Sequence, residues 1–421
     1  MKILFIACYS PFINNSAAIE TLQYLNKLSE IKDNEVFLLT VDFPKNSVYY
    51  DEELSKLINK NVKIYPVKGG KIFTRFVPRI SEEKTNNRTL NTFKMLKNIK
   101  NALVIPDMYY GWSNNASIVG REIVKKEKID VIFSMHEPPS SHLCAYKIKK
   151  IYSNIPWITY WSDPWLKDST REESFLIKKL IEKKMEKEVV INSDRFIFVT
   201  EANRNDYINS YNIDPDKTFI ITRGYDKKLF TRLSGSEKPE LINNDKINII
   251  YAGEIFTKLR DITPFINAVK EVRKNNIDLY NKLNILFFGN IDDIEVKREL
   301  ESLSICKVNR RIPFEEAIKY VLNSEVLLLF GNKNSKQIPA KIYEYFGASG
   351  RIFVIYGDEN DPLKELVENN ERCITSLNNS EKIYEHLTNL LSINKEEYFS
   401  KPDERYEWGN IVEKLNNILE V

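Results

Sequence analysis

Cysteine, histidine and long apolar runs are scarce in this chain of 421 residues. The four cysteines, Cys8, Cys144, Cys306 and Cys373, lie far apart, and no histidine has a partner at zinc-site spacing. These absences disfavour a disulfide framework and a metal centre, and the simpler expectation is a reducing cytoplasm. No run of about eighteen apolar residues occurs, so any membrane contact is expected to be peripheral, at the inner face of the membrane.

The sequence also lacks a large net charge, and it has no glycine near its N-terminus. The chain has 62 Lys and Arg against 59 Asp and Glu, and a net charge of +3 gives no global attraction to nucleic acid. No glycine precedes Gly69, so the loop after the apolar residues 2–8 lacks the glycine fingerprint of a dinucleotide site. We therefore expect neither a nucleic-acid partner nor NAD.

Short apolar segments, separated by helix-like patterns, are abundant and occur in two series. The first series is 2–8, 36–41, 131–134, 157–161 and 195–200, and the second is 247–252, 283–289, 326–330 and 351–356. Continuous apolar runs of this length are typical of parallel strands covered on both faces. The sequence therefore predicts an α/β protein with two doubly wound, Rossmann-like domains that face each other across a cleft.

The small, polar segment 234–239 separates the two series and has the composition of a linker. We expect a first domain over 1–232 and a second domain over 240–403. Residues 404–421 carry an apolar stripe at helical spacing, from Trp408 to Ile418, which predicts a helix that returns to the first domain.

Two polar side chains follow strands of the first series. His136 comes after 131–134, where it is either a group that bonds a sugar hydroxyl or a structural histidine. Asp163 follows 157–161 and precedes Pro164, so it is either a catalytic-side carboxylate or the cap of a turn.

The second series offers a loop suited to a diphosphate. Gly253 follows the strand 247–252, and Lys258 and Arg260 come shortly afterwards. Arginine binds phosphate oxygens in a bidentate way and lysine adds a mobile charge, although a solvated loop has the same composition. Gly289 allows close approach of a ligand to backbone, and Ile312 is a candidate to cover a base.

A strand-to-helix crossing follows at 337–350. Pro339 has a backbone suited to a first helical turn, so we expect a helix from Pro339 whose unpaired amides attract an anion. Lys341 and Glu344 are three residues apart and share a helical face, where the ammonium meets phosphate and the carboxylate accepts sugar hydroxyls. The alternative is an ordinary surface ion pair.

In this order, the segments resemble glycosyltransferase family 4 of the GT-B fold over nearly the whole chain. The segments that carry the resemblance are 106–112, 130–139, 156–165, 200–206, 223–226 and 339–350. The resemblance implies transfer of a hexose from a UDP- or GDP-linked donor to a glycan, lipid-linked or other acceptor, with retention of configuration and without a metal. It places such a protein in the synthesis of cell-surface polysaccharide or glycoconjugates.

The same resemblance implies a division of roles between the domains. The second domain would hold the donor, with Glu344 on the ribose and with Lys258 and Arg260 on the diphosphate. The first domain would bind the acceptor, and His136 and Asp163 would line the reacting side.

Two departures from the family pattern keep alternatives open. Lys336 stands where members commonly carry the first of two glutamates, and Glu254 stands where an arginine usually follows the glycine turn. A nucleotide-sugar 2-epimerase of the same fold and a non-catalytic glycosyltransferase-like partner subunit are the alternatives.

Residues 71–100 form a basic segment with interleaved apolar residues. Eight Lys or Arg stand against two Glu, a net charge of 8 − 2 = +6. The segment is expected either to lie on an anionic membrane surface or to form a solvated insertion or acceptor loop.

Overall fold

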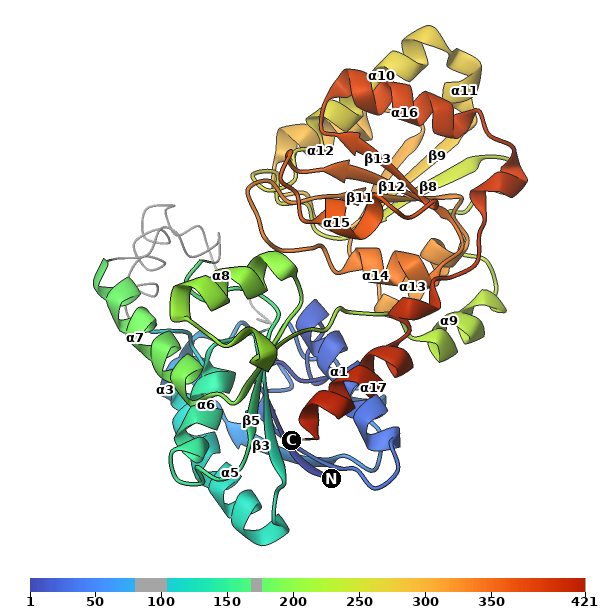
Figure 1. Cartoon of the computed structure of the whole chain (residues 1–421). Helices are drawn as coiled ribbons and strands as arrows, with labels where there is room; N and C mark the ends of the chain where they lie inside the picture. The colour runs from blue at the N-terminus through green and yellow to red at the C-terminus, as the bar shows by residue number, and fades with distance from the viewer. Residues whose placement is uncertain (80–103, 168–175, 421) are drawn as a thin grey trace. The chain divides into compact units, whose positions relative to one another are not determined.

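The computed structural model describes residues 1–79, 104–167 and 176–420. The chain divides into two compact units (Figure 1). The first unit comprises Met1–Thr222 with Ile411–Val421, and the second comprises Arg223–Asn410. The segment 234–239, expected as the linker, lies inside the second unit.

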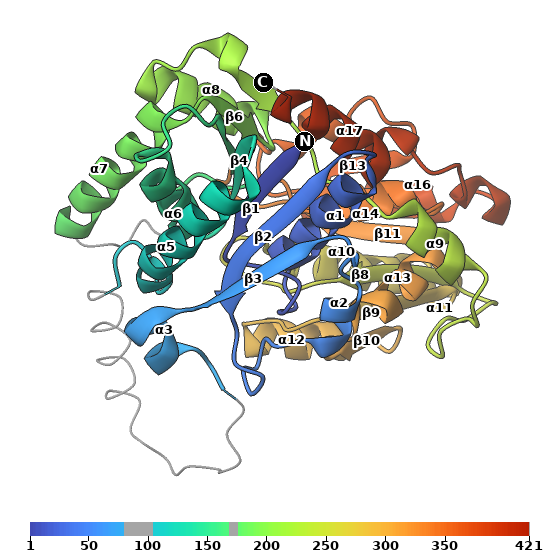
Figure 2. The same cartoon turned by 90° about the horizontal axis from the view of Figure 1, so that it is seen from below.

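The first unit contains a seven-stranded parallel sheet in the order β3-β2-β1-β4-β5-β6-β7. Its strands are β1 Lys2–Ala7, β2 Glu35–Asp42, β3 Lys63–Lys68, β4 Val131–His136, β5 Trp157–Trp161, β6 Arg195–Phe198 and β7 Thr218–Ile220. Its helices are α1 Ser16–Glu30, α2 Glu52–Lys56, α3 Gly70–Phe76, α5 Tyr110–Glu127, α6 Ser140–Lys149, α7 Leu176–Asn192 and α8 Glu201–Tyr211. Figure 2 shows helices on both faces of this sheet, as a doubly wound fold requires.

The second unit contains a six-stranded parallel sheet in the order β10-β9-β8-β11-β12-β13. Its strands are β8 Ile247–Ala252, β9 Leu283–Phe288, β10 Cys306–Asn309, β11 Val326–Phe330, β12 Arg351–Tyr356 and β13 Cys373–Leu377. Its helices are α9 Lys227–Ser234, α10 Thr263–Asn275, α11 Ile277–Asn281, α12 Ile294–Glu301, α13 Phe314–Leu322, α14 Lys341–Gly347, α15 Leu363–Val367 and α16 Ser380–Leu391. The prediction of two doubly wound α/β domains is therefore confirmed.

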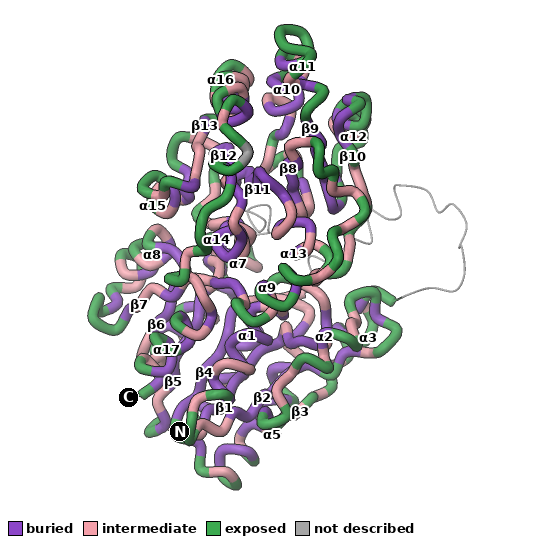
Figure 3. The backbone as a smooth tube through the Cα atoms, turned by 90° about the vertical axis from the view of Figure 1, so that its right-hand side faces the viewer, coloured by how far each residue is buried: buried purple, intermediate pink, exposed green. Residues whose placement is uncertain are grey.

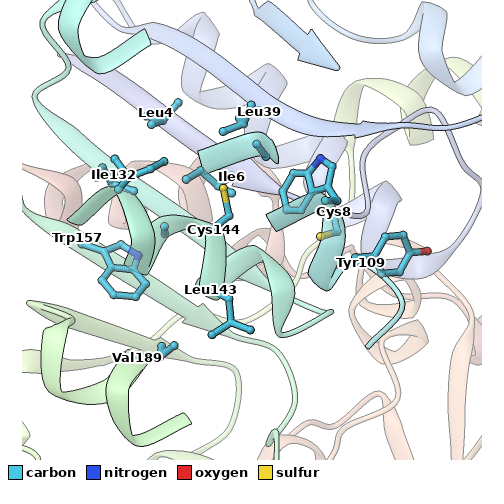
Figure 4. Packing of buried hydrophobic residues seen from close by; sticks show 14 of the residues in the cluster. Leu4, Ile6, Cys8, Leu39, Tyr109, Ile132, Leu143, Cys144, Trp157 and Val189 are labelled. Carbon is cyan, nitrogen blue, oxygen red and sulfur yellow. The ribbon is translucent and has the colours of Figure 1, made fainter. Parts of the chain in front are cut away.

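The apolar segments found in the sequence form the interior of both sheets. Figure 3 colours the central strands as buried, and Figure 4 shows side chains of β1, β2, β4 and β5 packed with side chains of α6 and α7 in the core of the first unit. Four strands, β3, β7, β10 and β13, are absent from the predicted series because they lie at sheet edges and are only partly buried. Edge strands need no continuous apolar run, so this signal misses them.

The helix at the C-terminus, α17 Trp408–Leu419, packs on the first unit as predicted. Ile411, Val412 and Leu415 are buried. Asn416 accepts a hydrogen bond from Asn34 Nδ2 at 2.8 Å, and the carbonyl of Ile418 accepts one from Arg195 Nη1 at 2.6 Å.

Within the described residues, no helix is long and apolar enough to span a membrane. Residues 80–100 of the basic segment lie outside the described residues. Its membrane contact stays a prediction.

A buried arginine fixes the carbonyl end of α14 in the second unit. Arg372 is 8% exposed, and its Nη1 donates to the carbonyl of Phe346 at 3.0 Å. Its Nη2 lies within hydrogen-bonding distance of three further carbonyls, those of Tyr345 (3.2 Å), Ala348 (2.5 Å) and Gly350 (3.0 Å). The last carbonyls of a helix lack intrahelical donors. Backbone amides of Ala348 and Asp403 donate to the carbonyls of Tyr345 and Phe346, and the guanidinium supplies the remaining donors.

We predict that Arg372→Met lowers the free energy of unfolding by roughly 2 to 4 kcal/mol, because it leaves the carbonyls of Ala348 and Gly350 without donors. Urea denaturation followed by circular dichroism measures this. Arg351 donates to two carbonyls at a more exposed position, and Arg351→Met is the matched control with a markedly smaller expected loss. Equal losses in both variants would contradict a special role for Arg372.

Candidate active site

The chain order of the second sheet reverses between β8 and β11. At such a switch point the two connections run to opposite faces of the sheet, which leaves room for a ligand at the carboxyl ends. The loop after β8 and the loop after β11 are joined here by two hydrogen bonds. Lys333 N donates to the carbonyl of Leu259 at 2.8 Å, and Arg260 Nε donates to Asn332 Oδ1 at 2.8 Å.

The Arg260 guanidinium is held at this switch point. Its Nη1 donates to the carbonyl of Glu254 at 2.8 Å and lies 3.3 Å from the hydroxyl of Tyr251. Among the described residues, nothing accepts a hydrogen bond from Nη2. The side chain is partly buried, so a preorganised cation with donor capacity to spare stands beside the end of β8.

Glu254, which stands where the family usually has an arginine, stabilises the same loop. Its carbonyl accepts from Arg260 and from the hydroxyl of Tyr251 at 3.1 Å, and its Oε2 accepts from Asn290 N at 3.2 Å. The residue therefore ties the loop after β8 to the loop after β9.

Two glycines let the backbone come close at this edge. Gly289 has φ +136°, and a Cβ built there would lie 2.1 Å from the carbonyl oxygen of Gly253. A Cβ at Gly253 would lie 2.3 Å from Cε of Lys341. Only glycine fits at position 289, whereas a side chain at position 253 would displace the end of Lys341, which packs over the glycine turn.

Lys341 and Glu344 are partly buried and have no hydrogen bond or ion pair with any described residue. Burial lowers the pKa of the Lys341 ammonium, and the nearby cations of Arg260 and Arg311 lower it further, whereas Glu344 opposes the shift. Burial raises the pKa of the Glu344 carboxyl, against the opposing charges of Lys341 and Arg223. Burying a charge without a partner destabilises the folded protein. Charged groups with shifted pKa values are therefore typical of ligand-binding sites.

The start of α14 differs from the sequence-based prediction. The helix begins at Lys341 rather than Pro339 and has only seven residues. Ile342 N and Tyr343 N donate to the carbonyls of Pro339 and Ala340, both at 3.2 Å, so a tight turn precedes the helix and uses these amides. The prediction of unpaired amides facing an anion from Pro339 was wrong for these two groups, and the positive charge of the site comes from side chains.

The remaining predicted residues of the second unit lie around this centre. Lys258 is exposed in the turn between Gly253 and Arg260. Ile312 is partly buried against the core cluster that also contains Ile342. Their contacts with a donor stay predictions.

In the first unit, His136 and Asp163 lie at the carboxyl ends of the neighbouring strands β4 and β5. The hydroxyl of Ser162 donates to the carbonyl of His136 at 2.7 Å, which joins the two loops. The His136 ring is buried, 1% exposed, and stacks on Trp161 with ring centroids 5.8 Å apart. Asp163 is partly buried.

Sequence reasoning missed Tyr251 and Asn332, which fix Arg260, and Arg372, which fixes α14. Asn332 lies two residues after a predicted strand, so extending the loop criterion there would have found it. Tyr251 lies inside a strand and Arg372 comes before one, and neither carries a local signal. The described residues contain no cluster of three His, Cys, Asp or Glu suited to a metal ion.

Comparison with known proteins agrees with this geometry. Residues 72–229 match the model of Glycosyltransferase Family 4. A search of curated proteins found no match. Among solved structures, a glycosyltransferase from Rickettsia africae ESF-5 is 14% identical with a TM-score of 0.62, over 100% of this chain and 97% of that one.

Two further structures show the same fold. HepE from Anabaena in complex with UDP is 12% identical with a TM-score of 0.60, over 100% of this chain and 99% of that one. A putative UDP-N-acetylglucosamine 2-epimerase from Listeria monocytogenes is 12% identical with a TM-score of 0.58, over 99% and 94% of the two chains. The fold is therefore GT-B, and it alone does not separate transferases from epimerases.

The family match over residues 72–229 favours a transferase. Residues 72–229 therefore resemble Glycosyltransferase Family 4, and the whole chain has the GT-B fold.

We predict that Gly289→Ala weakens binding of UDP or GDP at least about tenfold and destabilises the second unit by about 1 to 3 kcal/mol. The new Cβ would meet the carbonyl of Gly253 at a strained positive φ. Calorimetric titration and urea denaturation measure the two effects. Gly235→Ala is the matched control, because its nearest neighbour beyond the adjoining residues is 4.0 Å away. Wild-type affinity in Gly289→Ala would remove this turn from the site.

Proposed function

We propose that the protein transfers a hexose from a UDP- or GDP-linked donor, bound by the second unit, to a glycan or lipid-linked acceptor bound by the first. The observation that carries the proposal is the pair of desolvated charges at Lys341 and Glu344 beside Arg260. A nucleoside diphosphate supplies what both charges lack, namely anionic phosphate oxygens and ribose hydroxyl donors.

In this proposal, different charged side chains of the second unit bind different parts of the donor. Lys341 and Arg260 bind the diphosphate, Lys258 adds charge from the exposed turn, and Glu344 accepts hydrogen bonds from the ribose hydroxyls. Gly253 and Gly289 let the phosphates approach the backbone, and Ile312 covers the base. These side chains neutralise the leaving group, so no metal is assigned to the step.

The reaction then needs little proton chemistry from the protein. The bond from the anomeric carbon to the phosphate oxygen breaks, and the acceptor oxygen forms its bond on the same face. The acceptor proton passes to the departing phosphate oxygen, while His136 and Asp163 line the reacting side. Stabilisation of the charge that develops on the leaving diphosphate is therefore the main contribution of the protein.

The direct test is a panel of UDP- and GDP-sugars, followed for release of the nucleoside diphosphate with and without candidate glycan acceptors. Acceptor-dependent release with retained anomeric configuration supports the proposal. Epimerised sugar nucleotide would favour the 2-epimerase alternative, and binding without turnover would favour a non-catalytic subunit.

Such a reaction suits the synthesis of cell-surface polysaccharide or glycoconjugates at the cytoplasmic side of the membrane. This setting is part of the proposal and is supported by the family match.

We predict that Arg260→Ala lowers kcat about 10²-fold or more with the donor that the panel identifies, because one preorganised donor to the leaving group is lost. Steady-state kinetics measures the change. Arg298→Ala is the control, since this exposed arginine lies on α12 and, among the described residues, pairs only with Glu295 at 2.9 Å. A kcat within a factor of two of wild type would remove Arg260 from the mechanism.

We predict that nucleotide affinity has a bell-shaped dependence on pH. A bound diphosphate favours charged Lys341, so affinity falls as the pH rises through the lowered pKa of that ammonium. Ribose binding requires ionised Glu344, so affinity also falls as the pH drops through the raised pKa of that carboxyl. Calorimetric titration with UDP between about pH 5 and 10 measures both limbs.

The matched variants assign each limb. Lys341→Met keeps the stem that packs over Gly253 and should remove the alkaline limb, whereas Glu344→Gln should flatten the acid limb. The phosphate of UDP titrates near pH 6 and contributes equally to all three proteins. Unchanged limbs in both variants would contradict the assignment.

A further inference from the structure

Over residues 176–187, helix α7 of the first unit has its polarity reversed relative to an ordinary surface helix, whereas Val189 and Val190 near its end are buried in the core. Its acidic residues point inward, and Glu182 and Glu186 are only 3% and 2% exposed. Leu176, Ile177 and Leu180 face solvent and are 80%, 72% and 68% exposed. A surface helix normally buries its aliphatic side chains, so this arrangement leaves apolar area in water.

Specific hydrogen bonds hold the reversed orientation. Trp165 Nε1 donates to Glu182 Oε2 at 3.1 Å, and the hydroxyl of Tyr211 donates to Glu186 Oε2 at 2.7 Å. The hydroxyl of Tyr207 donates to Glu186 Oε1. These bonds compensate the buried carboxylates and fix the rotation of the helix, so the apolar face cannot turn inward without breaking them.

The outward face carries positive charge among its aliphatic side chains. Lys183, Lys184 and Lys187 are exposed and form no ion pair with any described residue. Ile181 and Ile191 continue the aliphatic surface at 39% and 65% exposure. No glutamate of α7 is exposed, because Glu182 and Glu186 are buried and Glu188 accepts from the hydroxyl of Tyr146 at 2.7 Å. In Figures 1 and 2, α7 lies at the margin of the first unit.

We propose that the outward face of α7 docks on an anionic lipid surface. Aliphatic side chains mixed with lysines on one helical face are typical of helices that lie at a membrane interface, where the lysines meet lipid phosphates. Lysine is depleted in protein interfaces, which disfavours a protein partner. A second copy in a symmetric dimer would bring lysines against lysines. This surface lies outside the basic segment 71–100 and is independent of the donor site.

Vesicle flotation tests the inference with the full-length protein. We expect wild type to float with vesicles that contain phosphatidylglycerol, and to float far less with vesicles of phosphatidylcholine alone or at 0.5 M salt. Ile177→Ser combined with Leu180→Ser should lower the partition coefficient at least about tenfold. Charge reversal of Lys183, Lys184 and Lys187 to glutamate should have a similar or larger effect.

The same types of substitution at exposed positions elsewhere in the chain serve as controls. Ile277→Ser with Ile294→Ser removes two isoleucines of the second unit that are 52% and 60% exposed, and it should leave flotation unchanged. Lys45, Lys125 and Lys401 are exposed lysines elsewhere, and their reversal to glutamate is the charge control. Circular dichroism and UDP titration confirm that each variant is folded, and they also separate failure of docking from failure of donor binding.

Three outcomes would overturn the inference. The first is absence of wild-type flotation with anionic vesicles. The second is equal flotation of the α7 variants and wild type, which would assign any membrane contact to another segment. The third is a dimer in sedimentation analysis that the serine variants abolish, which would assign the face to a second copy.

Discussion

Partial burial of two opposite charges on a helix of seven residues is the constraint on which the site depends. A helix this short is unstable alone, and desolvating Lys341 and Glu344 adds a further cost. Arg372 offsets part of this cost by capping the carbonyl end of α14 from the start of β13. The fold thus holds unpaired charges in place ahead of the ligand, and preorganisation of this kind is what electrostatic stabilisation of a leaving group requires.

A structural role in the loop after β8 explains why a glutamate is tolerated at position 254. The residue contributes its carbonyl to Arg260 and its carboxylate to the backbone of Asn290, so it shapes the loop after β8. In the proposed function, Arg260, six residues further along the chain, supplies the cation that the family usually has after the glycine turn. Its position is set by Asn332 across the switch point.

The sequence predicted the elements whose burial leaves a pattern of apolar residues, and it missed the features that depend on contacts between distant residues. Continuous apolar runs located the interior strands of both sheets, and the stripe from Trp408 to Ile418 located α17, because burial on both faces or on one stripe leaves a periodic trace. Edge strands such as β10 leave none. The loop criterion selected Gly253, which follows β8 directly, and Arg260 in the same loop, whereas Lys341 was selected for its helical spacing to Glu344. The contacts of Arg372 and the orientation of α7 depend on side chains that are distant in the sequence and meet only in the folded protein. No local sequence pattern predicts them.

The most direct test of the central claim is a crystal structure of the protein soaked with UDP or GDP. We predict diphosphate oxygens within hydrogen-bonding distance of Lys341 Nζ and of the Arg260 guanidinium, and ribose hydroxyls on the Glu344 carboxylate. A nucleotide bound elsewhere in the second unit, or bound at this edge without contact to Lys341 and Glu344, would contradict the account.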